Sequence, residues 1–383
     1  MIKQSRVYLD FAASTPLDKD VLNAMAGAYG EFANPSAQYK SANSARQKLL
    51  EARKEAAYFL QCNSDEIVFT SGATESNNMA ILGTCPAGKK GRVISIATEH
   101  SSIYEPLMQI KKRGYEVVMA AITEQGIIDL NALGKLLTKD TKLVTISYAN
   151  SEIGNVQPIS KVGQLINAYN ASRSTKVLFH TDASAATLNL SCDVSRLGAD
   201  LLSLGGAKIY GPHSSGILYV KRSTALQPLM FGGLQENGLR PGSEAIDSAA
   251  GIAKALSIAK SRRREDTELY RKLHNILLDE LKMYSIEYCY NGHHKERIFN
   301  VLSLSLPSQN GEDLVARLDA LGFEVATGAA CEAGNELPSR SLLALGLSKS
   351  QAQSSLRVSF GRNTTVSEIK RFAKALSGII QPL

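Results

Sequence analysis

Short apolar runs alternate with amphipathic stretches over the first two-thirds of the chain. We expect strands at Glu66–Thr70, Arg92–Ala97, Glu116–Ile122, Leu143–Ala149, Lys176–Thr181, Ala199–Leu204 and Gly216–Val220. Several of these runs are apolar throughout and rich in Val and Ile, as strands covered on both faces are. The stretches between them predict helices over Ser44–Leu60, Ile103–Lys112, Leu130–Leu137 and Lys161–Ala171. This alternation predicts an α/β fold around a mostly parallel sheet.

The last third of the chain has a different pattern. A long helical stretch, Ala245–Met283, precedes a mixture of short elements. These are strand-like Phe299–Leu306, Phe323–Thr327 and Leu356–Ser359, with helix-like Asp313–Leu321 and Ser367–Ile379. The pattern predicts a second domain of the α+β type, with the long helix as its connection to the first.

Composition narrows the class of protein. The chain has 383 residues, of which 44% are hydrophobic, enough for a large core and about two domains. No apolar run approaches the roughly 18 residues of a membrane helix, and the first residues do not resemble a signal peptide, so we expect a cytoplasmic protein that does not bind membranes. The net charge of +7 is modest, and the basic cluster Lys260–Arg264 is followed by Glu265 and Asp266. With no Trp either, we expect no direct binding of nucleic acid.

Five cysteines are scattered along the chain. None forms a C-x-x-C pair, so we expect neither a structural metal site nor a redox dithiol. Cys331 follows Gly328-Ala-Ala in a loop of small residues, a setting that suits a nucleophilic thiol, although an inert loop cysteine fits equally well.

Four segments carry groups that could bind a ligand. Thr70–Asn78 follows a predicted strand and opens a helix, which favours an anion site or an ordinary helix cap. Asp182 ends another strand and could pair with a cationic ring or cap the next helix. Lys208 follows a strand and could form a Schiff base or extend to solvent. Arg357 could bind a carboxylate or a surface acid.

A near match to a phosphate-binding loop has a simpler interpretation. Gly83 and Gly88-Lys89 have the spacing of such a loop, but no Ser or Thr follows to hold magnesium, and a helical stretch precedes it. We interpret this segment as a surface turn.

The order of these motifs is more specific than any one of them. Along the chain the order is Ser71-Gly-Ala-Thr74, Glu99-His100, Asp182, Lys208, a loop cysteine and Arg357. This order resembles that of the class V aminotransferase-type cysteine desulfurases. These are pyridoxal phosphate (PLP) enzymes of the NifS/IscS kind. The resemblance runs nearly end to end, through Tyr8–Pro16, Asn34–Ser36, Asn150–Gly154, Gly232–Glu236 and Val358–Thr365. The long segment after Cys331 is similar to the long-loop branch, which passes sulfur to partner proteins.

The resemblance implies a fold and a domain division. The fold would be that of the type I PLP-dependent transferases, as in aspartate aminotransferase. A large PLP-binding domain would comprise residues 15–255, and a small domain carrying the catalytic loop would comprise residues 1–14 and 256–383.

The resemblance also implies roles for particular residues. Lys208 would hold PLP covalently, Asp182 would keep its ring nitrogen protonated, and His100 would stack on the ring and shuttle protons. Ala73 and Thr74 would bind the phosphate, and Ser243 would reach the phosphate of the other subunit in a homodimer. Arg357, with Ser151 nearby, would bind the substrate carboxylate.

The implied reaction converts L-cysteine to L-alanine and leaves a persulfide on Cys331. Its sulfur would pass to an acceptor protein that builds iron–sulfur clusters or thiolates a substrate such as tRNA. Two alternatives stay open. One is another PLP enzyme of this fold, either a C–S or C–Se lyase or an aminotransferase. The other is a paralogue with impaired or no activity that serves as a binding partner.

Four positions depart from the family pattern. Where the family usually has Gln, His, Ser and Asn, this chain has Ala185, Ala207, Gly205 and Ser151, respectively. The first three would remove hydrogen bonds to the cofactor, each worth roughly 1.5–3 kcal/mol where a charged group is involved. We therefore expect weaker binding of PLP, with the reacting groups retained.

Overall fold

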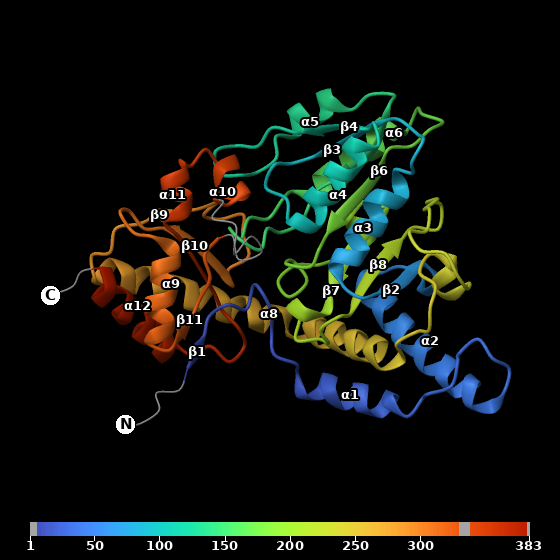
Figure 1. Cartoon of the computed structure of the whole chain (residues 1–383), viewed down its shortest axis with the longest axis horizontal. Coiled ribbons are helices and arrows are strands. Elements are labelled where there is room, and N and C mark those ends of the chain that lie inside the picture. Colours follow the sequence, from blue (N-terminus) through green and yellow to red (C-terminus); the bar gives the residue numbers. More distant parts are fainter. Residues whose placement is uncertain (1–5, 329–337, 381–383) are drawn as a thin grey trace.

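The computed structural model describes residues 6–328 and 338–380. Its larger sheet has seven strands in the order β2-β8-β7-β6-β5-β3-β4 (Figure 1). The bounds are β2 Ile67–Thr70, β3 Arg92–Ser95, β4 Glu116–Met119, β5 Thr141–Thr145, β6 Leu178–Asp182, β7 Leu201–Gly205 and β8 Gly216–Val220. In this sheet β8 runs opposite to the other six strands, which are parallel to one another. The predicted α/β fold with a mostly parallel sheet is therefore confirmed.

Helices cover this sheet and connect its strands. They are α1 Lys19–Tyr29, α2 Lys40–Leu60, α3 Ala73–Thr84, α4 Ser101–Lys112, α5 Leu130–Leu136, α6 Ile159–Asn170 and α7 Val194–Leu197, with the short 3-10 turns η1 Ser64–Glu66, η2 Gly206–Lys208 and η3 Gln235–Gly238. Apart from the edge strand β4, the strands are buried along most of their length, as their apolar sequences predict. The sequence pattern missed α1, where buried apolar positions are few.

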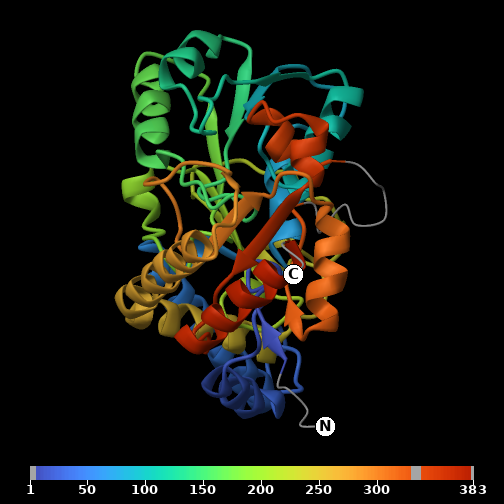
Figure 2. The same ribbon diagram turned by 90° about the vertical axis from the view of Figure 1, so that its left-hand side faces the viewer.

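The C-terminal third builds smaller sheets. In one sheet, β10 (Val301–Ser305) pairs with β9 (Cys289–Tyr290) and β12 (Ser355–Ser359). In the other, β1 (Val7–Tyr8), near the start of the chain, pairs with β11 (Phe323–Glu324). The helices here are α9 Gly311–Ala320, α10 Arg340–Ala344, α11 Lys349–Gln353 and α12 Val366–Ile380. Figure 2 shows this part of the molecule facing the viewer.

The helix α8 (Ile246–Met283) connects the two parts of the molecule (Figure 1). Its first half places Ile252 and Leu256 in the apolar cluster under the large sheet. Its second half places Leu273 and Leu277 in a separate cluster with β10, β12 and α12. Each half therefore packs on its own core, while the domain boundary after residue 255 stays a prediction. Within the described ranges, no helix is long and apolar enough to cross a membrane.

Candidate active site

A cavity of about 470 Å³ opens where the large sheet meets the C-terminal part of the chain. Strand ends are the usual binding place in parallel α/β sheets because the connecting loops diverge there. Seven of the residues predicted from the sequence line this cavity: Ala73, Thr74, His100, Ser151, Asp182, Lys208 and Arg357. The sequence therefore predicted part of the cavity wall, and the roles of these residues stay predictions.

The N-terminus of α3 forms one wall. Gly72 precedes the helix with φ 153°, and no side chain caps the first backbone N–H groups. The chain approaches closely here, since a Cβ added at Gly205 would lie 3.2 Å from the backbone nitrogen of Ala73. Uncapped N–H groups and the helix dipole favour an anion such as a phosphate. This geometry favours the anion site over an ordinary Ser/Thr cap.

Asp182 is held firmly at the end of β6. Its Oδ1 accepts a hydrogen bond from the backbone nitrogen of Ser184 at 2.8 Å, and its Oδ2 accepts one from Asn77 Nδ2 at 2.7 Å. The residue is 7% exposed and lines the cavity. A buried carboxylate fixed in this way is suited to pairing with a cationic ring. Through Oδ1, Asp182 also caps the turn that follows β6, so the capping interpretation holds as well and is compatible with this pairing.

His100 precedes α4 and caps it with its own ring. The ring Nδ1 accepts a hydrogen bond from the backbone nitrogen of Ser102 at 3.1 Å. Burial, followed by the nearby charge of Lys208, lowers the pKa of His100 to about 4. The ring is therefore neutral near pH 7.

Glu99, next to His100, also lines the cavity. Its Oε1 accepts a hydrogen bond from the backbone nitrogen of Ser147 at 2.8 Å, and its Oε2 accepts one from the Ser147 hydroxyl. Burial raises the pKa of Glu99 to about 8, and the neighbouring charge of Asp182 adds to this effect. Glu99 thus joins the ends of β3 and β5 beside the cavity.

Lys208 and Arg357 approach the cavity from different parts of the fold. Lys208 lies in η2, directly after β7. Arg357 lies on β12 and forms an ion pair with Asp10, whose Oδ1 is 2.8 Å from Arg357 Nη2. The Nε of Arg357 is buried without a hydrogen-bond partner in the described structure. A guanidinium lining the cavity in this way can receive a carboxylate.

Cys331 lies outside the described residues, and Ser243 is the predicted residue in the described ranges that does not line this cavity. Ser243 is exposed and lines a separate hollow with Tyr29 and Phe32. Its place outside the cavity of its own chain is what a contribution to another subunit requires.

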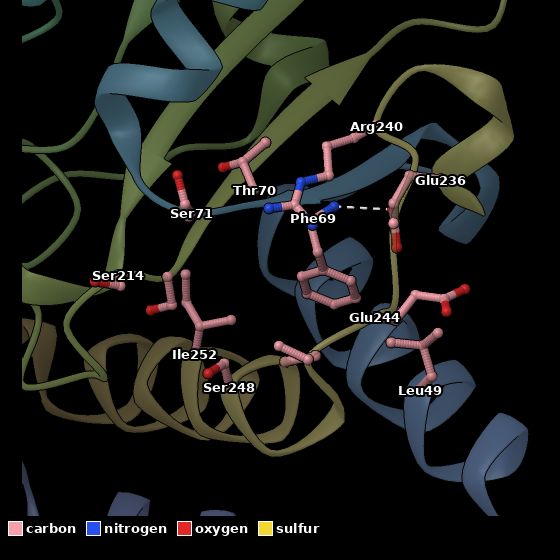
Figure 3. Close-up of a pocket in the computed structure, with 15 residues that line it drawn as sticks. Leu49, Phe69, Thr70, Ser71, Ser214, Glu236, Arg240, Glu244, Ser248 and Ile252 are labelled. Atoms are coloured by element: carbon pink, nitrogen blue, oxygen red, sulfur yellow. Dashed lines mark hydrogen bonds between the residues drawn. The ribbon is translucent and has the colours of Figure 1, made fainter. Parts of the chain in front are cut away.

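A smaller cavity, of about 80 Å³, lies behind Ser71 between the end of β2 and α8 (Figure 3). The backbone nitrogen of Phe69 donates to Glu236 there at 2.9 Å. Arg240 Nε donates to Glu75, in the first turn of α3, at 3.1 Å. These bonds hold the segment before Ser243 beside the N-terminus of α3.

Several residues of the site were given no role by the sequence analysis, although Asp10 and Asn77 lie within motifs that it used. Asp10, Asn77 and Ser102 support Arg357, Asp182 and His100, but each lies far along the chain from at least one of its partners. Arg340 also lines the cavity, and its guanidinium lies 4.0 Å from the ring centre of Tyr104. The four departures from the family pattern all line the cavity: Ser151, Ala185, Gly205 and Ala207.

The donor set fits PLP. The uncapped N-terminus of α3 suits a phosphate, Asp182 suits a protonated ring nitrogen, and Lys208 supplies an amine at the same cavity. The hydroxyl of Ser184 is buried without a partner among the described residues and lines the cavity, so it too can bind a polar ligand atom. No group of three or more acidic, His or Cys side chains that could hold a metal occurs in the described ranges.

Comparisons with known proteins agree with this geometry. Residues 7–372 match the family Aminotransferase class-V. The "Cysteine desulfurase IscS 1" of Archaeoglobus fulgidus is 34% identical, over 98% of this chain and 97% of that protein. A solved structure titled "NIFS-LIKE PROTEIN" superposes with a TM-score of 0.91 at 29% identity, over 99% of this chain and 100% of its own. Another, "SspA in complex with cysteine", has a TM-score of 0.81 at 30% identity, over 92% and 98% of the two chains.

Proposed function

This chain belongs to the class-V aminotransferase family, and we propose that it is a PLP-dependent cysteine desulfurase that converts L-cysteine to L-alanine. The observation that carries this proposal is one cavity lined by Asp182, Lys208, His100 and Arg357 beside an uncapped helix N-terminus. The relatives named as cysteine desulfurases, which match nearly the whole chain, support the same activity.

The residues of this chain divide the work of binding the cofactor. Ala73 and Thr74 would hold the phosphate at the start of α3, Asp182 would pair with the ring nitrogen, and Lys208 would provide the covalent attachment. When bound, PLP supplies an electron sink that stabilises negative charge next to the substrate amine. Burial of Asp182 strengthens its pairing because little water competes for the charge.

Arg357 binds the substrate carboxylate, with the Ser151 hydroxyl close by. The Cys331 thiolate then attacks the sulfur of cysteine. The bond between that sulfur and the β-carbon breaks, an S–S bond forms on Cys331, and a proton completes alanine. Cysteine and the Cys331 thiol thus become alanine and a Cys331 persulfide, with no external oxidant or reductant. An acceptor protein, either a cluster-assembly scaffold or a thiolation enzyme, takes the outer sulfur.

The site is completed by a second copy of the chain, in which Ser243 reaches the phosphate of its partner. Exposed apolar side chains near Ser243 support a homodimer, since Phe32 is 91% exposed in the isolated chain and shares a hollow with Ser243. Phe231 and Leu234, on the segment leading to Ser243, are 89% and 88% exposed. Light scattering of the purified protein gives the oligomeric state.

A cytoplasmic location is supported by the free thiols at Cys62, Cys85, Cys192 and Cys289.

The test is an absorbance spectrum of the purified protein before and after PLP and then L-cysteine, with alanine and sulfide measured in the same tube. We expect the visible band of lysine-bound PLP, its change on adding cysteine, and release of alanine. Lys208→Ala removes the band, whereas Lys221→Ala, at an exposed lysine paired with Asp200, keeps it.

The cysteine variants separate a desulfurase from a lyase. Cys331→Ala abolishes alanine release with excess reductant present, whereas Cys289→Ala, at an exposed cysteine, leaves it unchanged. Continued turnover by Cys331→Ala favours a lyase of the same fold. A band without alanine favours an aminotransferase or another PLP reaction, and a protein that stays colourless with excess PLP contradicts the proposal.

A further inference from the structure

A buried chain of hydrogen bonds joins Asp182 to His100. Asn77, on the buried side of α3, has no exposed surface. Its Nδ2 donates to Asp182 Oδ2 at 2.7 Å and to Ser102 Oγ at 2.8 Å. Ser102 Oγ in turn lies 2.8 Å from His100 Nδ1. Two ionisable groups of the cavity, which come from the ends of different strands, are therefore connected through Asn77 and Ser102.

The chemistry of the partners fixes the orientation of the Asn77 amide. An ionised carboxylate can only accept hydrogen bonds, so the NH₂ group of Asn77 has to face Asp182. The amide oxygen is then left buried without a partner in the described structure. Leaving a buried acceptor without a hydrogen bond costs free energy. An apolar side chain could fill the same space without this cost, so packing alone does not explain an Asn at position 77. Both amide protons of Asn77 are used, one toward Asp182 and one toward Ser102.

The same chain fixes the proton on the His100 ring. The backbone nitrogen of Ser102 donates to His100 Nδ1 at 3.1 Å, and a backbone N–H can only donate. Nδ1 therefore carries no proton. Because Asn77 donates to Ser102 Oγ, the hydroxyl proton of Ser102 is directed toward Nδ1 as well. The neutral ring carries its single proton on Nε2.

The charges around His100 keep the ring neutral. Among the described residues, Lys208, Arg340 and Arg357 oppose a positive charge on it, and Asp182 favours one. With burial as the largest effect, the pKa of His100 lies at about 4. The network therefore acts on an uncharged imidazole throughout the physiological range of pH.

We propose that Asn77 is a positioning residue that orients Asp182 and, through Ser102, fixes His100 as the neutral ring with its proton on Nε2. In this form the ring offers a hydrogen-bond donor at Nε2 and has no lone pair there to accept a proton. The tautomer is a property of the chain itself and does not rest on the proposed function.

The tautomer is measured by ¹⁵N NMR on protein labelled at histidine, first without cofactor and then with PLP bound. The chain has six histidines, and the spectrum of His100→Gln identifies the signals of His100. We expect a protonated Nε2 and an unprotonated Nδ1 near pH 7 in both forms. A proton on Nδ1, in the other tautomer or in the imidazolium, overturns the proposal.

Variants test the part played by Asn77. Asn77→Leu should move the Nδ1 signal of His100, change the pH titration of the visible band of bound PLP, and weaken PLP binding about 10- to 100-fold, because Asp182 loses a buried donor. The matched control is Asn78→Leu, one position further on, where Nδ2 donates to Thr74 O instead. Equal effects of the two substitutions overturn the proposal.

A second variant guards against misfolding of Asn77→Leu. Ser102→Ala breaks the link to His100 but leaves the bond between Asn77 and Asp182. We expect it to move the His100 signal and to keep PLP affinity within about twofold. An unchanged His100 signal contradicts the proposal. None of these measurements depends on cysteine turnover. Failure of the proposed desulfurase activity can therefore be distinguished from failure of this proposal.

Discussion

Arg357 and Asp10 form an ion pair between residues 347 positions apart in the sequence, with Arg357 Nη2 2.8 Å from Asp10 Oδ1. The pair joins β12 to the segment after β1, and the Arg357 side chain is 6% exposed. One edge of the guanidinium is thereby fixed, while the buried Nε has no partner in the described structure. Asp10 therefore sets the direction in which the Arg357 guanidinium faces the cavity.

We expect Arg357→Lys to raise the KM for cysteine about 10-fold or more, with a smaller change in kcat. Lysine keeps the positive charge but loses the two-pronged geometry that matches a carboxylate, so binding suffers most. Asp10→Asn should act in the same direction, more weakly. Steady-state kinetics measure both, with Arg264→Lys on an exposed face of α8 as the control. A fall in kcat at constant KM would contradict a role in carboxylate binding.

Glu99 makes stability depend on pH. Its pKa is raised from 4.5 to about 8, so the folded protein keeps a proton that the unfolded chain releases within this interval. The free energy of unfolding should therefore decrease as pH rises from about 4.5 to about 8. Glu99→Gln has no such proton, and a Gln amide can keep both contacts to Ser147. Urea unfolding at several pH values should give a smaller alkaline loss for Glu99→Gln, and an identical slope would refute this account.

The ion pair between Arg362 and Asp266 ties α8 to the segment after β12. Their side chains are 8% and 0% exposed, and Arg362 Nε lies 2.8 Å from Asp266 Oδ2. Removing one partner of a buried pair leaves an uncompensated charge, so Asp266→Asn should lower the free energy of unfolding by about 3–5 kcal/mol.

Helix α8 also supplies the control for this prediction. Arg264 and Glu268 form a pair whose side chains are 92% and 67% exposed. Glu268→Gln should leave stability unchanged within error, because solvent screens such pairs. Chemical denaturation of both variants tests the contrast, and equal effects would show that burial does not govern these pairs.

Replacing Gly by Ala should change the stability of the protein in opposite directions at two positions. A Cβ at Gly163, in α6, would lie 2.2 Å from the backbone oxygen of Leu197, so Gly163→Ala should destabilise the protein by about 1–3 kcal/mol. At Gly27, in α1, nothing lies within 4 Å of the added carbon, so Gly27→Ala should stabilise it by about 0.5–1 kcal/mol. Thermal unfolding distinguishes the signs, and a loss of stability at Gly27 would contradict the prediction.

We expect weak binding of PLP, because three residues of the cavity lack side chains that could donate hydrogen bonds to it. Ala185, Gly205 and Ala207 line the cavity without side-chain donors, and each hydrogen bond to a charged group contributes roughly 1.5–3 kcal/mol. We expect a dissociation constant in the micromolar range and tighter binding by Ala185→Gln. Fluorescence titration measures both, and nanomolar affinity of the unaltered protein would show that other contacts compensate.

The sequence alone determined the elements that local patterns specify. Apolar runs predicted β2 to β8 to within a few residues at most ends, and amphipathic spacing predicted α2, α4 and α8. Strand ends were least accurate, since β4 ends at Met119 and not at Ile122, because it is an edge strand with a single partner. Motif order was informative because Asp182 ends a strand while Lys208 and His100 follow strands, and strand ends converge on one edge of a parallel sheet.

Tertiary structure alone decided which residues support that site. Asn77 lies 105 positions from Asp182, and Asp10 lies 347 positions from Arg357, so no local pattern could pair them. The proton position on His100 likewise depends on where Asn77 and Ser102 point once α3 and α4 have packed together. Hydrogen bonds depend on distances and directions that local periodicity does not encode. Part of the cavity wall could therefore be predicted from the sequence, whereas the buried bonds that orient it required the fold.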